Sequence, residues 1–153
     1  MRKKTATPTA ELKLLSAALR HLTDAEHLAD ASNPRCSLDQ AYHLAGFGPE
    51  CARKAAIAAS WANTSLGHDL GDDAEAVLEL ALVLNPAASR YELRGWEQAY
   101  PVLAAWNPDC RYKATGTFER SQTDPMIREA WLAATEFIAA MWAVVRVALE
   151  ALR

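Results

Sequence analysis

Apolar residues recur along most of the chain with the period of an α-helix. No stretch long enough for a β-strand shows the alternation of apolar and polar residues that is typical of one. Thr7 and Pro8 are typical of a helix N-cap and first helical residue, and they predict a first helix that ends near residues 32–34. One face of that helix carries its apolar residues, which are Leu15, Ala18, Leu19, Leu22, Ala25 and Ala29. Residues 1–7 are predicted to be a disordered tail.

A second helix is predicted to begin after Ser37, which forms a capping box with Gln40. It should run to about Asn63 unless Pro49 and the glycines before it break or kink the helix. Most residues on its apolar face are small, so a neighbouring helix could approach closely. This face comprises Ala41, Leu44, Ala45, Cys51, Ala52, Ala55, Ala59 and Ala62.

Further along, residues 64–71 are predicted to be a connection and residues 72–84 a third helix. A fourth helix should start at the capping box of Ser89 and Glu92. Pro101 should interrupt or kink it, because proline cannot donate the helical hydrogen bond.

Residues 107–124 have little apolar periodicity, and a loop of that length in a small domain favours a role in function or partner contact. Asp124 and Pro125 predict the start of a last helix that reaches about Leu152. Its apolar arc is wider than the stripe of about 100° typical of a surface helix, which places it centrally or against a second subunit. The arc contains Ile127, Trp131, Ala134, Phe137, Ile138, Met141, Trp142, Val144, Val145, Ala148 and Leu149.

Composition supports one globular unit, predicted to be a single domain over residues 8–153. The 153 residues are 51% hydrophobic and 23% charged, with a net charge of −3, which argues against a surface coated with phosphate-binding groups.

A chain of this size folds without a metal or disulfide. Its three cysteines are expected to be reduced thiols of a cytoplasmic protein. No signal peptide or membrane-spanning stretch is expected. The sequence therefore predicts an all-α, up-and-down bundle of about five helices.

The first predicted helix carries four residues that could do chemistry: Arg20, His21, Asp24 and His27. Arg20, Asp24 and His27 share one face, opposite the apolar stripe. They are interpreted either as a solvated face or as a polar cluster in which the aspartate orients an arginine or a histidine.

The second predicted helix, if continuous, carries a narrow stripe of His43, Phe47, Glu50, Lys54 and Trp61. Aromatic rings interleaved with charges are typical of an interface or a groove. The alternative is a helix that packs on both sides within its own bundle.

Three further residues complete the candidate site. His68 lies beside Asp69 in the predicted connection, although the aspartates there are also explained as helix caps. Arg111 and Tyr112 in the long loop could contact phosphate and stack on a base, or could simply pin the loop. No metal-binding, phosphate-loop or catalytic-triad motif is present, so no metal or cofactor is expected.

The run SLDQAYHLAGFGPECARKA, residues 37–55, resembles the second-helix signature of HEPN domains (higher eukaryotes and prokaryotes nucleotide-binding). RHLTDA, residues 20–25, is similar to the first helix of small bacterial HEPN-like proteins. GHDL at residues 67–70 and the segment 106–112 fit more loosely. The resemblance spans about residues 10–115 and implies a helical bundle that dimerises.

Many HEPN members are metal-independent ribonucleases of toxin–antitoxin or phage-defence systems, with an arginine and a histidine a few residues apart, late in the domain. This chain has no histidine after His68, and the only similar spacing is Arg20 to His27. The resemblance thus implies a dimeric component that binds RNA, a nucleotide or a cognate protein without the usual catalytic pair. The alternatives are a diverged ribonuclease that uses Arg20 and His27, and a purely structural adaptor.

Overall fold

The computed structural model describes residues 10–57 and 96–151, and the side chains of residues 12–55 and 97–139. All regular structure in these two ranges is helical, which confirms the prediction of an all-α bundle. The elements are α1 (Ala10–Ala29), α2 (Leu38–Ile57), α5 (Trp96–Ala99), α6 (Pro101–Ala104), the 3-10 helix η2 (Pro108–Tyr112) and α7 (Arg120–Ala151). The predicted tail, the predicted connection at 64–71 and the predicted helix at 72–84 lie outside the described residues.

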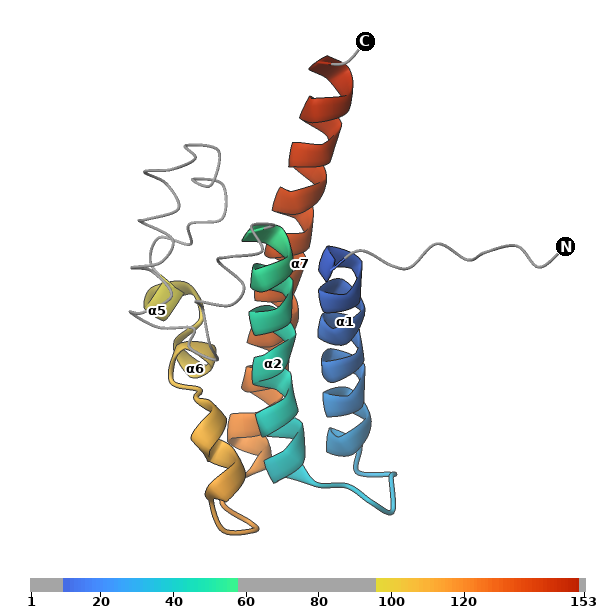
Figure 1. The fold of residues 1–153 in the computed structure, drawn as a ribbon. Coiled ribbons are helices and arrows are strands. Elements are labelled where there is room, and N and C mark those ends of the chain that lie inside the picture. Colours follow the sequence, from blue (N-terminus) through green and yellow to red (C-terminus); the bar gives the residue numbers. More distant parts are fainter. Residues whose placement is uncertain (1–9, 58–95, 152–153) are drawn as a thin grey trace, which may run out of the picture.

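Helix α2 occupies the centre of the described bundle, where it packs against both α1 and α7 (Figure 1). Helix α1 runs antiparallel to α2 and α7, and the segment from α5 to η2 lies on the side of α2 away from α1. Helix α7 extends past the ends of α1 and α2. None of the described helices combines the length and apolar character that a membrane crossing requires.

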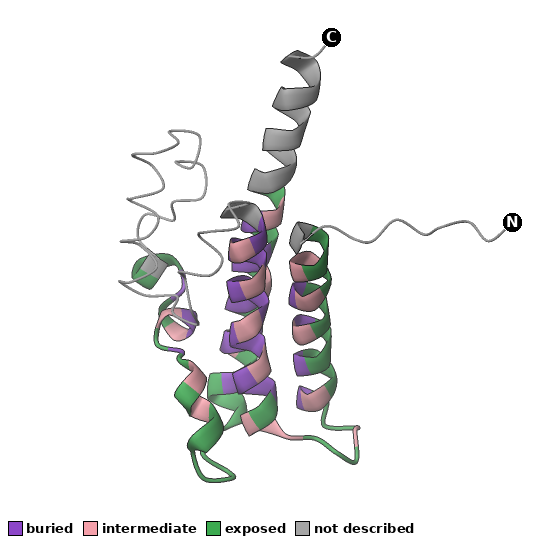
Figure 2. Ribbon diagram, in the orientation of Figure 1, coloured by how far each residue is buried: buried purple, intermediate pink, exposed green. Residues whose placement is uncertain are grey.

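The apolar stripes predicted for the first two helices face each other in the core (Figure 2). On α1, Ala18, Leu22 and Ala25 are fully buried, whereas Leu19 at the edge of the stripe is exposed. On α2 the alanines at 41, 45, 52 and 55 are fully buried. Gly48 lies so close to Leu22 that a Cβ atom on the glycine would press on the leucine side chain. Small residues therefore bring the two helix backbones together, as predicted.

Helix α2 continues through Pro49 without a break, although a proline inside a helix removes one backbone hydrogen bond. The prolyl ring is fully buried, so packing compensates for the lost bond. The predicted cap is present, because the Ser37 hydroxyl accepts a hydrogen bond from the Gln40 N–H at 3.4 Å.

The end of α1 is closed by donors from three other places in the chain. Asn33 donates its side-chain N–H to the His27 carbonyl, and the Ser37 backbone N–H donates to that of Leu28. The Arg120 guanidinium reaches from α7 to the Ala29 carbonyl at 2.8 Å. The last carbonyls of a helix have no partner within the helix, so these bonds fix where α1 stops.

Two predictions for the second half of the chain have different outcomes. The interruption at Pro101 is confirmed, since α5 ends at Ala99 and α6 begins at Pro101. The predicted start of the last helix at Asp124 is wrong: α7 begins at Arg120 and Pro125 lies within it. Gln122 explains the earlier start, because its side chain accepts from the Glu119 N–H while its own backbone N–H donates to the Glu119 carbonyl.

The predicted loop at 107–124 is largely ordered by α2. It contains η2 and the first turn of α7. The Asp39 carboxylate accepts hydrogen bonds from the backbone N–H groups of Gly116 at 2.7 Å and Phe118 at 2.9 Å. The Phe118 ring stacks on Tyr42, with ring centroids 3.9 Å apart. This segment is therefore a fixed wall of the bundle rather than an independent loop.

Candidate functional site

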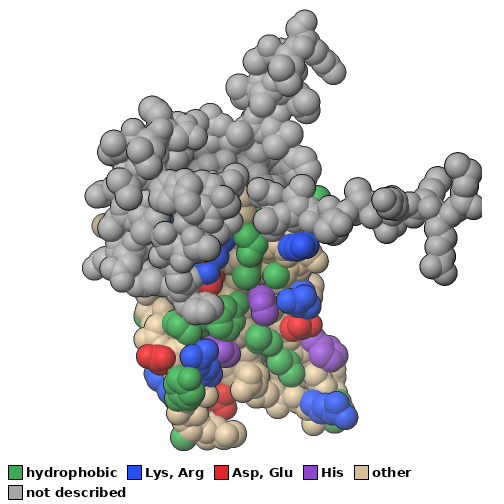
Figure 3. All heavy atoms as spheres, viewed as in Figure 1, with side chains coloured by type: hydrophobic (Ala, Val, Ile, Leu, Met, Phe, Trp, Pro, Cys, Tyr) green, Lys and Arg blue, Asp and Glu red, His purple; other side chains and the backbone are tan. Residues whose placement is uncertain are grey.

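Histidine, charged and apolar side chains gather on the face of the described bundle that Figure 3 presents. This face is formed by α1, α2 and the segment that contains η2. On α1, Arg20, Asp24 and His27 are exposed, as the sequence pattern predicts. His21 is only half-buried, and its ring turns toward α2.

Four aromatic rings from three segments converge on this face. Phe47 of α2 lies at the centre, 5.5 Å between centroids from His21 of α1 and 4.9 Å from His43 one turn earlier on α2. Trp106, between α6 and η2, lies 5.1 Å from Phe47 and 6.2 Å from His43. We call these four residues the histidine–aromatic cluster.

A glycine explains how Trp106 reaches α2. A Cβ atom at Gly46 would overlap the indole ring, so only a residue without a side chain allows the tryptophan to lie against the helix backbone. The indole is 4% exposed. The sequence did not predict that Trp106 packs on α2, and Gly46, in the middle of a helix, was the signal that could have indicated a close neighbour.

Both histidines of the cluster favour the neutral form. Burial lowers the pKa of His21 from its ordinary 6.5, and Arg20 lowers it further, while Asp24 and Glu50 act in the opposite direction. Burial likewise lowers the pKa of His43. Neutral imidazoles can accept or donate hydrogen bonds at neutral pH, so the cluster holds two such groups.

Two polar atoms of the cluster have no hydrogen-bond partner among the described residues. They are His43 Nδ1 and Trp106 Nε1, and both are buried. Buried polar atoms are normally paired with protein, water or ligand.

An ion pair borders the cluster on α2. Lys54 Nζ lies 2.7 Å from Glu50 Oε1, and both side chains are largely buried. Burial raises the pKa of the neighbouring Cys51 thiol to about 11, which disfavours its reactive thiolate form at neutral pH. Of the stripe predicted for the second helix, His43 and Glu50 are buried, whereas Phe47 and Lys54 are partly buried.

Arg111 and Tyr112 lie at the edge of the histidine–aromatic cluster that is opposite to α1. The helix η2 that carries them begins at Pro108, and Asn107 caps it by accepting from the Asp109 N–H at 2.8 Å. The Arg111 guanidinium lies over the Tyr112 ring, 4.8 Å from its centroid, and the ring is 75% exposed. Arg111 is also close enough to His43 to lower the pKa of that histidine.

The structure thus brings together only part of the predicted site. His21, His43, Phe47 and Glu50 are neighbours, with Arg111 at the edge. His27 is not part of the cluster, since it lies near Asp30 at the end of α1. Arg20 and Asp24 form no ion pair in the described part of the chain. Two predicted residues, Trp61 and His68, lie outside the described residues.

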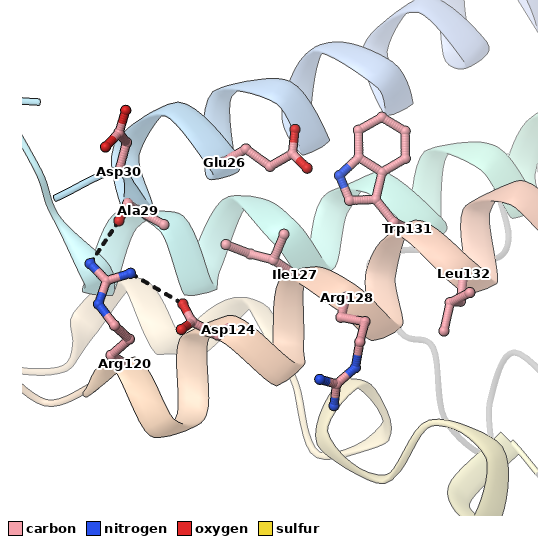
Figure 4. A pocket seen from close by; sticks show the side chains of 9 residues that line it. All are labelled: Glu26, Ala29, Asp30, Arg120, Asp124, Ile127, Arg128, Trp131 and Leu132. Carbon is pink, nitrogen blue, oxygen red and sulfur yellow. Dashed lines mark hydrogen bonds and ion pairs between the residues drawn. The ribbon is translucent and has the colours of Figure 1, made fainter. Parts of the chain in front are cut away.

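A groove lies between α1 and α7, apart from the histidine–aromatic cluster. Its volume is about 640 Å³. Its lining residues, shown in Figure 4, are Glu26, Ala29, Asp30, Arg120, Asp124, Ile127, Arg128, Trp131 and Leu132. Among the described side chains, no group of three or more histidine, cysteine or acidic residues is placed to hold a metal ion.

No protein-family model matches the sequence, and no curated protein or solved structure matches it either. The family resemblance seen in residues 20–55 therefore stays a prediction, and the site is interpreted from its own geometry.

Proposed function

We propose that the chain binds single-stranded RNA through the histidine–aromatic cluster and the cations at its edges. The observation that carries this proposal is the combination of neutral histidines and aromatic rings between Arg20 on α1 and Arg111 on η2. Arginines bind phosphate, exposed aromatic rings stack on bases, and histidines can hydrogen-bond to base edges or to the ribose 2′-hydroxyl. Single-stranded RNA exposes its phosphates, its bases and its ribose 2′-hydroxyl groups at the same time.

Tyr112 is the candidate platform for a base. Its ring is exposed, and the guanidinium over it leaves the other ring face for stacking. Arg111 and Arg20 would then contact the backbone on either side of the cluster. Within the systems that the HEPN resemblance implies, this is the role of an RNA-binding component of a toxin–antitoxin or phage-defence module.

Fluorescence anisotropy with a labelled single-stranded RNA tests the proposal. We expect Arg111→Ala and Tyr112→Ala to weaken binding, the first with a smaller dependence of affinity on salt because one phosphate contact is lost. Arg35→Ala is the matched control, because it removes the same charge from an exposed position in the connection between α1 and α2, outside both the cluster and the groove between α1 and α7. Equal affinity of all variants, or no binding by the wild-type protein, would refute the proposal and favour a protein partner on this face.

A further inference from the structure

The groove between α1 and α7 has an apolar floor that the described chain leaves partly uncovered. Ile127 and Trp131 of α7 form the floor, and Leu132 beside them is 54% exposed. At one end Arg120 closes the groove by bonding the Ala29 carbonyl and pairing with Asp124 at 3.4 Å, as the dashed lines in Figure 4 show. Apolar surface of this kind favours burial against another surface.

Two opposite charges flank this floor and find no partner in the described chain. Glu26 belongs to the α1 wall and Arg128 to the α7 wall, both are exposed, and neither side chain makes a hydrogen bond or ion pair with the described residues. Figure 4 shows Glu26 reaching over the groove toward Trp131, whereas Arg128 extends away from α1. Asp30 is satisfied within its own turn, because its carboxylate accepts from the Ser32 N–H and hydroxyl.

We propose that a second copy of this chain covers the groove, in a two-fold symmetric dimer in which Glu26 of each copy pairs with Arg128 of the other. An axis parallel to the helices places α1 of one copy against α7 of its partner. The α1 wall of each copy, which carries Glu26, then faces the α7 wall of the other copy, which carries Arg128. The same contact therefore occurs twice, as a two-fold symmetric interface requires. Leu132 and Trp131 of the two copies supply the apolar centre of the contact.

The same axis leaves every helix direction unchanged, so the ends of α7 that extend past α1 and α2 would project from the same side of the dimer.

Sedimentation velocity over a micromolar concentration range tests this dimer by charge exchange. We expect the wild-type protein to dimerise. Glu26→Arg alone and Arg128→Glu alone should each raise the dimer dissociation constant by about tenfold or more, because each places two like-charge contacts in the interface. The double variant restores the pairing with reversed signs and should restore dimerisation.

Leu132→Glu is a second variant that tests the apolar contact without threatening the fold, since its side chain is already exposed in the monomer. It should also weaken the dimer, and circular dichroism should show unchanged helix content and melting temperature for the monomer. A monomeric wild-type protein would overturn the proposal. Single charge variants that dimerise normally, or a double variant that does not recover, would also overturn it. RNA binding is measured separately on the other face, so the two proposals can fail independently.

Discussion

The carboxylate of Glu129 on α7 accepts a hydrogen bond of 2.9 Å from the backbone N–H of Leu103 on α6. A second bond of the same length comes from the Val102 N–H. Helix α6 has no side-chain cap of its own at Tyr100, so a neighbouring helix provides the cap. The negative charge also suits the positive end of the α6 helix. This contact holds the segment that delivers Trp106 to the histidine–aromatic cluster.

We expect Glu129→Ala to lower the free energy of unfolding by about 1–3 kcal/mol, because it leaves one buried and one partly buried N–H group without an acceptor. Glu129→Gln should be milder, since the amide oxygen can still accept a bond. Urea denaturation followed by circular dichroism measures both, with Glu97→Ala at an exposed position as the control. A loss no larger than that of the control would show that the cap contributes nothing to stability.

Replacement of Gly46 should destabilise the protein even though alanine is the better helix former. Glycine to alanine in a helix normally stabilises by up to about 1 kcal/mol. Here the new methyl group would overlap Trp106, and we expect a net loss of about 1–3 kcal/mol from overpacking. The double variant Gly46→Ala, Trp106→Leu provides the check, because the smaller side chain should remove the clash. A double-mutant cycle with no coupling between the two sites would contradict this packing.

Asp39 should make stability depend on acid pH. Burial alone would raise the pKa of this carboxyl group, but hydrogen bonds from Gly116, Phe118 and Thr117 outweigh it, so the folded pKa lies below the ordinary 3.8. A lowered folded pKa contributes stability above the unfolded pKa, and that contribution is lost as the pH falls through the folded value. Asp39→Asn should therefore be less stable than wild type at neutral pH, with a smaller difference near pH 3. The exposed Asp109→Asn serves as control. A stability difference that does not change with pH would contradict this role.

The sequence predicted the interior of α1 and α2 because their buried alanines follow the helical period, and burial depends mainly on that period. It predicted the break at Pro101 for an equally local reason. The start of α7 was wrong because Asp124 and Pro125 are the stronger local signal, whereas the actual cap depends on the Gln122 side chain folding back to Glu119. The residue preferences at helix ends do not reliably decide between two possible starts a few residues apart.

The candidate site could be predicted only in part, because it depends on how helices pack. The pattern identified His21 and His43 as separate candidates, but their meeting across Phe47 depends on the rotation of α1 against α2. Periodicity does not encode that rotation. Trp106 belongs to a segment distant in the sequence, and it packs on α2 in the space that Gly46 leaves free. The sequence of α2 alone indicates this contact only through a glycine in the middle of the helix.

Metal-independent RNA cleavage needs a base near neutrality at the ribose 2′-hydroxyl and a cation for the charge that develops on the phosphate. Arg20 and His27 have the only spacing in the sequence that resembles the HEPN pair. Both are exposed on α1, but His27 lies near Asp30 rather than with the histidine–aromatic cluster. His21 has the neutral form that a base requires, although its ring is packed against Phe47.

We therefore expect mixed RNA incubated with the pure protein in EDTA to stay intact, and to stay equally intact with the Arg20→Ala, His27→Ala double variant. Gel electrophoresis over several hours measures this, and a His21→Ala sample tests the remaining base. Cleavage by the wild type that the double variant or His21→Ala abolishes would identify an enzyme and replace the binding role proposed above. Cleavage by all three proteins would exclude these side chains and direct attention to a contaminant or to other residues. Because EDTA removes divalent metal, cleavage under these conditions does not depend on a divalent ion, and the comparison with the variants shows whether Arg20, His27 or His21 carries it.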